Sequence, residues 1–299
     1  MTDAKASRAR TRLRTRSVDN PPVLLCLLGP AAVVTNGQLR LLDVRPKALA
    51  LLVRLALGDG PQERDALAGL LFPDAANPRE SLRWHLSHLR ARVPMPIEAD
   101  RRTIALDAPT DVADFRVGAE RIVSGHFEDA SKILALYRGD LCAGLRVSAS
   151  ADFDSWLYIH EDELRRTFRR ATLSFAEWAV DKRRAGEALP SLLRLTEVDP
   201  YLEQAHVLLV RASEASGAAD AARHAYDRYQ RIVRKELHAE PRPELVRVYE
   251  AETPRGRTLP IDELVPCGRS RCTSLNGLGR NRLFSRSTAP PVTPMGLRR

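Results

Sequence analysis

Residues 78–93 concentrate the side chains of this chain that are best suited to bind an anionic partner. Drawn as a helix at about 100° per residue, the segment has one apolar stripe and a polar, basic remainder. The stripe consists of Leu82, Leu86, Leu89 and Val93. The opposite face carries Glu80, Ser81, Trp84, Ser87, His88 and Ala91, with Arg79, Arg83 and Arg90 on one flank and His85 and Arg92 on the other. The segment predicts an amphipathic helix whose exposed tryptophan lies between two rows of cations.

This arrangement is typical of a helix that lies in the major groove of double-stranded DNA. Arginines on both flanks reach backbone phosphates and supply salt-dependent affinity. At the centre, Glu80 can accept a hydrogen bond from cytosine N4, and Trp84 can pack on a thymine methyl. Ser87 and His88 can form hydrogen bonds with more than one kind of base. The pattern leaves one alternative open, in which Trp84 packs under the following domain and the arginines are merely solvated.

Other chemistries have little support in the residues. His85 and His88 have no third metal ligand nearby, and Cys267 and Cys272 have no further ligands, so neither pair predicts a zinc site. The sequence also contains no nucleophile elbow, no His-Glu-x-x-His and no Gly-x-x-x-x-Gly-Lys-Ser/Thr phosphate loop. We therefore expect no enzyme activity, metal or cofactor.

The surrounding sequence predicts a winged helix-turn-helix over residues 23–110. Strands are expected at 23–28, 31–35 and 38–42, the last two joined by Asn36-Gly37, a strong hairpin signal. Helices are expected from Pro46 until Gly58 stops the first one, from about 62 to 71, and at 78–93, where Asn77 and Pro78 suit the N-cap and first position. Residues 97–106 are expected to form two short strands of a terminal hairpin around residues 100–102. Arg101 and Arg102 at its turn suit a wing that meets DNA, with an ordinary charged turn as the alternative.

Residues 111–251 predict a second, all-helical domain. Gly186 and Gly217 are 31 residues apart and each separates amphipathic helices, which is close to a helical-hairpin repeat of the tetratricopeptide (TPR) kind. This segment contains 21 basic and 24 acidic residues, so bulk attraction does not favour DNA, and a protein partner is the better expectation.

The overall charge of +9 resides in the two ends of the chain. Residues 1–22 and 252–299 are rich in arginine and lack apolar periodicity, so we expect both to be disordered tails. The middle, 23–251, carries 32 basic and 33 acidic residues. No apolar stretch is long enough to span a membrane, and the four scattered cysteines fit a reducing compartment. These features predict a soluble, cytoplasmic protein.

Several segments together make residues 23–250 resemble the antibiotic regulatory protein family of actinomycetes. They are Leu28-Gly29-Pro30; the helix at 79–93 with Leu82, His85, Leu86, Ser87, Leu89 and Arg90; Tyr137-Arg138-Gly139-Asp140-Leu141; Phe153-Asp154-Ser155-Trp156-Leu157; 221–229; and 237–250. No single segment is decisive, but their order and spacing are specific.

The resemblance implies an OmpR-type winged helix followed by a bacterial transcriptional activator domain. Such a protein would bind direct repeats in double-stranded promoter DNA as a homodimer and recruit RNA polymerase holoenzyme, often for antibiotic biosynthesis genes. The family often has Asn and Arg where this chain has Glu80 and His88, so its base preference should be its own. The usual Gly-Gly-Tyr of the wing is missing around residues 100–104.

A different class of function remains as the alternative, namely a helical-repeat adaptor that binds proteins and touches DNA only weakly. It predicts that removing the arginines of 78–93 leaves activity intact.

Overall fold

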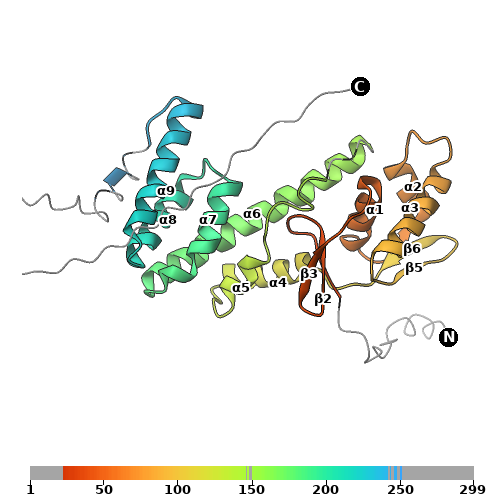
Figure 1. The fold of residues 1–299 in the computed structure, drawn as a ribbon, viewed down its shortest axis with the longest axis horizontal. Coiled ribbons are helices and arrows are strands. Elements are labelled where there is room, and N and C mark those ends of the chain that lie inside the picture. The colour runs from red at the N-terminus through yellow and green to blue at the C-terminus, as the bar shows by residue number, and fades with distance from the viewer. Residues whose placement is uncertain are drawn as a thin grey trace, which may run out of the picture. The chain divides into compact units, whose positions relative to one another are not determined.

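The computed structural model describes residues 23–145, 147, 150–241, 243, 246, 247 and 250, and Figure 1 labels their helices and strands. The two tails predicted to be disordered, 1–22 and 252–299, lie outside these residues, as do Cys267 and Cys272. As predicted, the fold is mainly helical, and a region of small sheets and helices precedes a region of helices alone. No helix within the described ranges is long and apolar enough to cross a bilayer.

The chain begins with a small antiparallel sheet. Its strands are β1 (Leu24–Cys26), β2 (Ala32–Thr35) and β3 (Gln38–Leu41), in that spatial order. Asn36 and Gly37 make the turn between β2 and β3 with φ angles of 53° and 75°. Both lie in the left-handed region that this residue pair tolerates, so the hairpin predicted there is confirmed.

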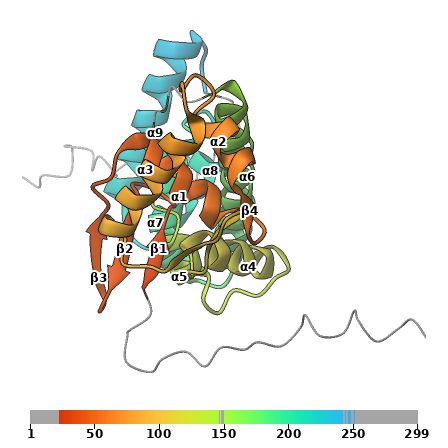
Figure 2. The same cartoon turned by 90° about the vertical axis from the view of Figure 1, so that its right-hand side faces the viewer.

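Three helices and a hairpin complete the winged helix-turn-helix. The helices α1 (Pro46–Ala56), α2 (Arg64–Leu71) and α3 (Pro78–Arg92) pack on one another (Figure 2). Strands β5 (Ile97–Ala99) and β6 (Thr103–Leu106) then form the wing. The structure therefore contains the predicted sheet, three helices and terminal hairpin.

The second helix begins later than the sequence predicts. Gln62 and Glu63, expected in its first turn, instead form strand β4 (Gln62–Glu63) and pair with Ile104 and Thr103 of β6. The amide of Arg64 continues this ladder by donating to the carbonyl oxygen of Arg102 at 2.8 Å. The backbone groups of residues 62–64 form hydrogen bonds with residues 102–104, about 40 positions later, and local periodicity does not reveal such a pairing.

The remaining elements are helical. They are α4 (Asp111–Val123), α5 (Ala130–Ala135), α6 (Ala151–Asp181), the short 3₁₀ turn η1 (Ala185–Glu187), α7 (Leu189–Val198), α8 (Glu203–Ala215), α9 (Ala219–Ile232) and the π-helical turn η2 (Val233–Leu237). Helix α6 packs on α7 across Gly186, and α8 packs on α9 across Gly217. These successive helix pairs form the TPR-like arrangement that the glycine spacing predicts.

One apolar core runs through both regions. It joins Leu51 and Leu86 of the winged helix to Phe115, Phe168 and Leu209 of the helical region. A boundary at residues 110 and 111 therefore stays a prediction, because the core is continuous across it.

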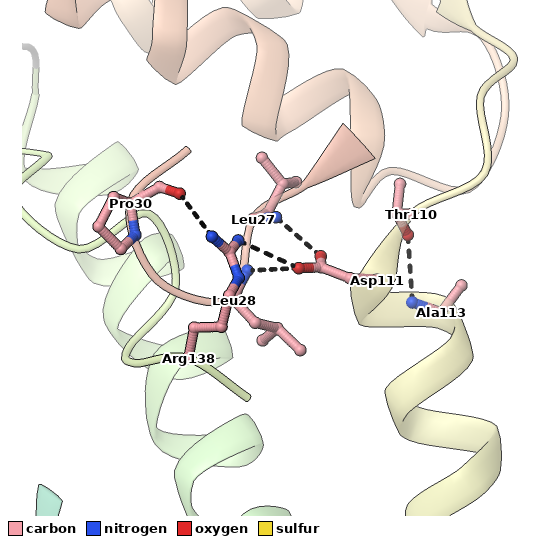
Figure 3. Close-up of polar contacts among 7 residues, drawn as sticks. All are labelled: Leu27, Leu28, Pro30, Thr110, Asp111, Ala113 and Arg138. Atoms are coloured by element: carbon pink, nitrogen blue, oxygen red, sulfur yellow. Dashed lines mark hydrogen bonds and ion pairs between the residues drawn. The ribbon is translucent and has the colours of Figure 1, made fainter. Parts of the chain in front are cut away.

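A buried carboxylate joins the first strand to the first helix of the helical region (Figure 3). Asp111, the first residue of α4, accepts the amide of Leu27 at 2.7 Å and that of Leu28 at 3.1 Å. The guanidinium of Arg138 lies 3.5 Å from the same carboxylate and donates to the carbonyl oxygen of Pro30 at 3.4 Å. Burial raises the pKa of Asp111, while the two amide donors and Arg138 oppose that rise.

Around Asp111, two segments that carry the family resemblance come together. Gly29 donates to the carbonyl oxygen of Asp140, and Cys142 donates to that of Leu27. Gly29 has a φ of 110°, and a Cβ there would lie 3.0 Å from the Cβ of Arg138. Only glycine therefore allows Leu28-Gly29-Pro30 to pass this close to residues 137–141.

We predict that Asp111→Ala destabilises the protein by about 2–4 kcal/mol, because it leaves two buried amides and a guanidinium without their partner. Urea unfolding measures the loss. Asp114→Ala is the matched control, since Asp114 is exposed in the same first turn of α4 and should cost no more than about 1 kcal/mol. Equal losses for the two variants would contradict the role given to Asp111.

A second buried titratable group lies in the helical region. His206 of α8 is 1% exposed, its Nε2 donates to the carbonyl oxygen of Pro200 at 3.0 Å, and its ring lies 4.3 Å from that of Tyr229. Burial lowers the pKa of His206 to about 4. The folded protein therefore holds a neutral imidazole under conditions where the unfolded chain takes up a proton.

This difference predicts a loss of stability on mild acidification. As pH falls from 6.5 towards 4, the unfolded state binds the proton first, so folding should weaken by up to about 3 kcal/mol and then level off. Urea unfolding of wild type and His206→Gln across this range isolates the contribution, and His224→Gln serves as the exposed control. Parallel pH profiles for wild type and His206→Gln would show that His206 is not held neutral.

Candidate nucleic-acid interface

Helix α3 is fixed by its buried stripe and by its N-terminal cap. Leu82, Leu86 and Leu89 are buried, as the helical periodicity predicts. The side chain of Asn77 accepts the amide of Glu80 at 3.2 Å, and its Nδ2 donates to Glu80 Oε2 at 3.2 Å. The predicted cap is confirmed, and it engages one of the two carboxylate oxygens of Glu80.

Trp84 lies at the centre of the opposite face and is 50% exposed. The ring of His88 stacks on its indole with centroids 5.5 Å apart, and the guanidinium of Arg45 lies 5.1 Å from the indole centre. The helical region therefore does not cover Trp84, and the alternative in which it packs under that region is wrong. These neighbours hold the indole in place while half of its surface stays open.

His85 supports the helix from its flank. Its ring stacks on Phe72 at 5.0 Å, and the ammonium of Lys47 lies 5.5 Å from the Phe72 ring. Burial lowers the pKa of His85, and the nearby His88, Lys47 and Arg45 lower it further. The described residues contain no group of three or more His, Cys, Asp or Glu side chains placed to hold a metal ion.

A basic cleft of about 540 Å³ opens between the first turns of α2 and α3 and the turn of the wing. Its lining residues are Glu63, Arg64, Asp65, Arg79, Leu82, Arg83, Arg101 and Arg102. Five arginines face two carboxylates there, so the potential in the cleft is positive and favours an anionic group.

The wing turn is held in a defined position beside this cleft. Asp100 accepts the amides of Thr103 at 2.6 Å and Arg102 at 2.7 Å, and these bonds lower the pKa of Asp100. The Nε of Arg64 donates to the carbonyl oxygen of Asp100 at 2.8 Å. Arg64 thus fixes the turn that carries Arg101 and Arg102 to the start of α2.

All the residues predicted to bind DNA lie on α3 or on the wing turn, but their states differ. Arg83, Arg101 and Arg102 have exposed side chains without a hydrogen bond or ion pair to any described residue. The others with cationic side chains have protein partners: Arg79 binds Asp65, Arg90 donates to the carbonyl oxygen of Ile97, and Arg92 donates to that of Asp43. Ser87 is exposed, whereas Ser81 and His88 are half-buried. Their contacts with DNA stay predictions.

Three further cations lie at this surface that the helical wheel of residues 78–93 does not reveal, namely Arg45, Lys47 and Arg64. Arg45 and Lys47 flank Pro46 at the start of α1, and Arg64 is the first residue of α2. A cation is unfavourable at a helix N-terminus because the helix dipole is positive there. Arg79 in the first turn of α3 repeats the pattern, so cations at three successive helix starts were a signal that the sequence already contained.

Comparison with known proteins identifies the helical region. Residues 112–251 match the family model of the bacterial transcriptional activator domain. The helical region is therefore similar to this domain, and we call residues 112–251 the activator domain. Preceded by a winged helix, this activator domain confirms the resemblance to the antibiotic regulatory proteins.

A solved structure of Mycobacterium tuberculosis EmbR in complex with a low-affinity phosphopeptide is also similar. The two are 26% identical with a TM-score of 0.49, over 77% of this chain and 64% of that chain. The present chain therefore spans less than two thirds of the EmbR structure. No curated protein sequence matches it.

The activator domain contacts the winged helix directly at the start of α6. Ser150, the N-cap of α6, donates to the carbonyl oxygen of Leu70 at 2.5 Å, and the guanidinium of Arg54 lies 5.0 Å from the ring of Trp156. Together with Asp111, these contacts hold the activator domain against β1, α1 and α2, and they leave the Trp84 face of α3 uncovered.

Proposed function

We propose that this protein is a sequence-specific activator of transcription that binds promoter DNA through α3. The observation that carries the proposal is the exposed Trp84 face of α3, bordered by cations and attached to a bacterial transcriptional activator domain. The dimensions of a major groove admit such a helix. In the alternative, an adaptor that binds proteins and touches DNA only weakly, the main contacts would lie on the acidic helical region, and the cations at three unfavourable helix starts would have no assigned partner.

The residues divide by role. Arg83, Arg101 and Arg102 line the cleft and their side chains have no hydrogen bond or ion pair to any described residue, and we assign them to backbone phosphates on the side of α3 that faces the cleft. Arg45 and Lys47 supply positive charge near Trp84 and the adjoining Phe72. Trp84 and Ser87 face the base edges, with the methyl group of thymine as the natural partner of the indole.

The first turn of α3 and the wing turn line the same cleft, so the winged helix would bind DNA through one surface and in one orientation. A single copy reads only a short element, so two copies on direct repeats, as a homodimer on DNA, account for selective promoter binding. In this proposal the acidic activator domain contacts RNA polymerase holoenzyme, and the protein acts in the cytoplasm at the nucleoid.

Two substitutions separate affinity from recognition. Arg83→Ala should weaken binding to every duplex and reduce the slope of log affinity against log salt by about 1, because one phosphate contact is lost. Trp84→Ala should mainly reduce the preference for the DNA upstream of the protein's own gene over random duplex. Fluorescence anisotropy of the full chain across a salt series measures both effects.

Arg223→Ala is the matched control, since it removes an exposed arginine from α9 of the activator domain. It should leave affinity, preference and salt slope unchanged. A wild-type protein without any preference, or an Arg83→Ala variant with unchanged binding, would replace the activator proposal by the adaptor alternative.

Transcription in vitro tests the second half of the proposal. With purified RNA polymerase holoenzyme and a promoter that carries the preferred site, wild type should increase transcript yield, and Arg83→Ala should not at the same protein concentration. A wild-type protein that occupies the site without raising transcript yield would exclude recruitment of polymerase.

A further inference from the structure

One ion pair in the basic cleft joins the first turns of two helices. Arg79 of α3 donates from Nε to Oδ1 of Asp65 and from Nη2 to Oδ2, both at 2.6 Å. Asp65 belongs to the first turn of α2. The two parallel bonds are the bidentate geometry in which guanidinium and carboxylate planes match best.

This pair is poorly placed to stabilise the fold. The two side chains are 73% and 65% exposed, and ion pairs between such exposed groups contribute little to stability because water and salt screen them. The dipole of α3 also disfavours a cation at Arg79. The bidentate geometry fixes the guanidinium in one orientation, which is useful for recognition.

The remaining donors of Arg79 suit a base better than a phosphate. Asp65 occupies the edge formed by Nε and Nη2, which leaves the edge formed by Nη1 and Nη2. That edge can donate two hydrogen bonds to O6 and N7 of guanine. A phosphate at the same place would meet an ion pair without net charge and would also meet the Asp65 carboxylate beside it.

We propose that Asp65 is a positioning residue that holds Arg79 so that its free edge reads one guanine in the major groove. The proposal rests on the proposed function, and it replaces a phosphate contact of Arg79 by a base contact. Residues near the start of a recognition helix commonly reach base edges, which agrees with the place of Arg79 in the first turn of α3.

A base contact and a phosphate contact of Arg79 differ in how they depend on salt concentration. A neutral Asp65–Arg79 pair displaces no counterion, so the double variant Asp65→Asn/Arg79→Ala, which removes both charges, should leave the salt slope unchanged while abolishing one base preference. Asp65→Asn alone should instead steepen the salt slope by about 0.9, because it frees the Arg79 guanidinium, which then binds a phosphate.

The experiment selects preferred sequences from a pool of random duplexes with the full-length protein. We expect wild type to select a guanine that Arg79→Ala and Asp65→Asn no longer select. In anisotropy titrations, changing this guanine should weaken wild type by about 5- to 150-fold and each variant by less than about 3-fold. Asp65→Glu, which keeps the carboxylate, should recover part of the preference.

Asp74→Asn is the matched control, because it removes an exposed carboxylate from the loop between α2 and α3 that has no arginine partner among the described residues. It should keep the guanine preference. Selection of the same guanine by Asp65→Asn and wild type, or a shallower salt slope for the double variant Asp65→Asn/Arg79→Ala, would overturn the proposal. If wild type selects no sequence at all, the proposed function itself fails. If wild type and Asp65→Asn select the same sequence, only the positioning role of Asp65 fails.

Discussion

The buried carboxylate of Asp111 is the contact on which the arrangement of the two regions depends. It accepts the amides of Leu27 and Leu28, which leave the sheet at the end of β1, and it pairs with Arg138 from the loop after α5. A buried charge of this kind is tolerated only where all its partners are present. The activator domain is therefore attached to the winged helix in one arrangement, in which α6 contacts α1 and α2 while α3 stays open. The position of bound DNA would then fix where the activator domain presents itself to a partner.

Whereas Asp111 stabilises the fold, the cations of the basic surface lower its stability and favour binding. Arg45, Lys47, Arg64 and Arg79 lie at helix starts, where the dipole disfavours them. Some of this cost is offset inside the protein: Arg64 bonds to a carbonyl oxygen of the wing turn, Arg45 lies against the Trp84 ring, and Arg79 binds Asp65. The anionic partner would supply the rest. Cations that persist at such positions are better explained by binding than by folding.

The sequence predicted well those features that local periodicity determines. The buried stripe of α3, its Asn77 cap and the Asn36-Gly37 hairpin follow from residues within one or two turns of each other, and the structure contains all three. The features that were missed depend on distant partners. Strand β4 needs β6, Asp111 needs Leu27 and Leu28, and Asp65 needs Arg79 in the next helix. No pattern within a single helix or strand encodes those pairings. The helical wheel therefore places the side chains predicted to bind DNA on α3 and the wing turn, but it does not reveal the residues that position them.

These positioning contacts change how the predicted interface should be understood. A helix wheel treats every arginine on a flank as equivalent, but the structure distinguishes them by their partners. Arg90 and Arg92 bond to carbonyl oxygens and so brace the end of α3, Arg79 is oriented by a carboxylate, and Arg83 is left free. Free cations supply affinity for any duplex, whereas a cation held in one orientation can discriminate, since an unsuitable base cannot be accommodated by rotation of the side chain. The same reasoning applies to Trp84, which His88 and Arg45 hold in place. Selectivity on this surface would thus come from the few side chains that the protein has already immobilised before DNA arrives.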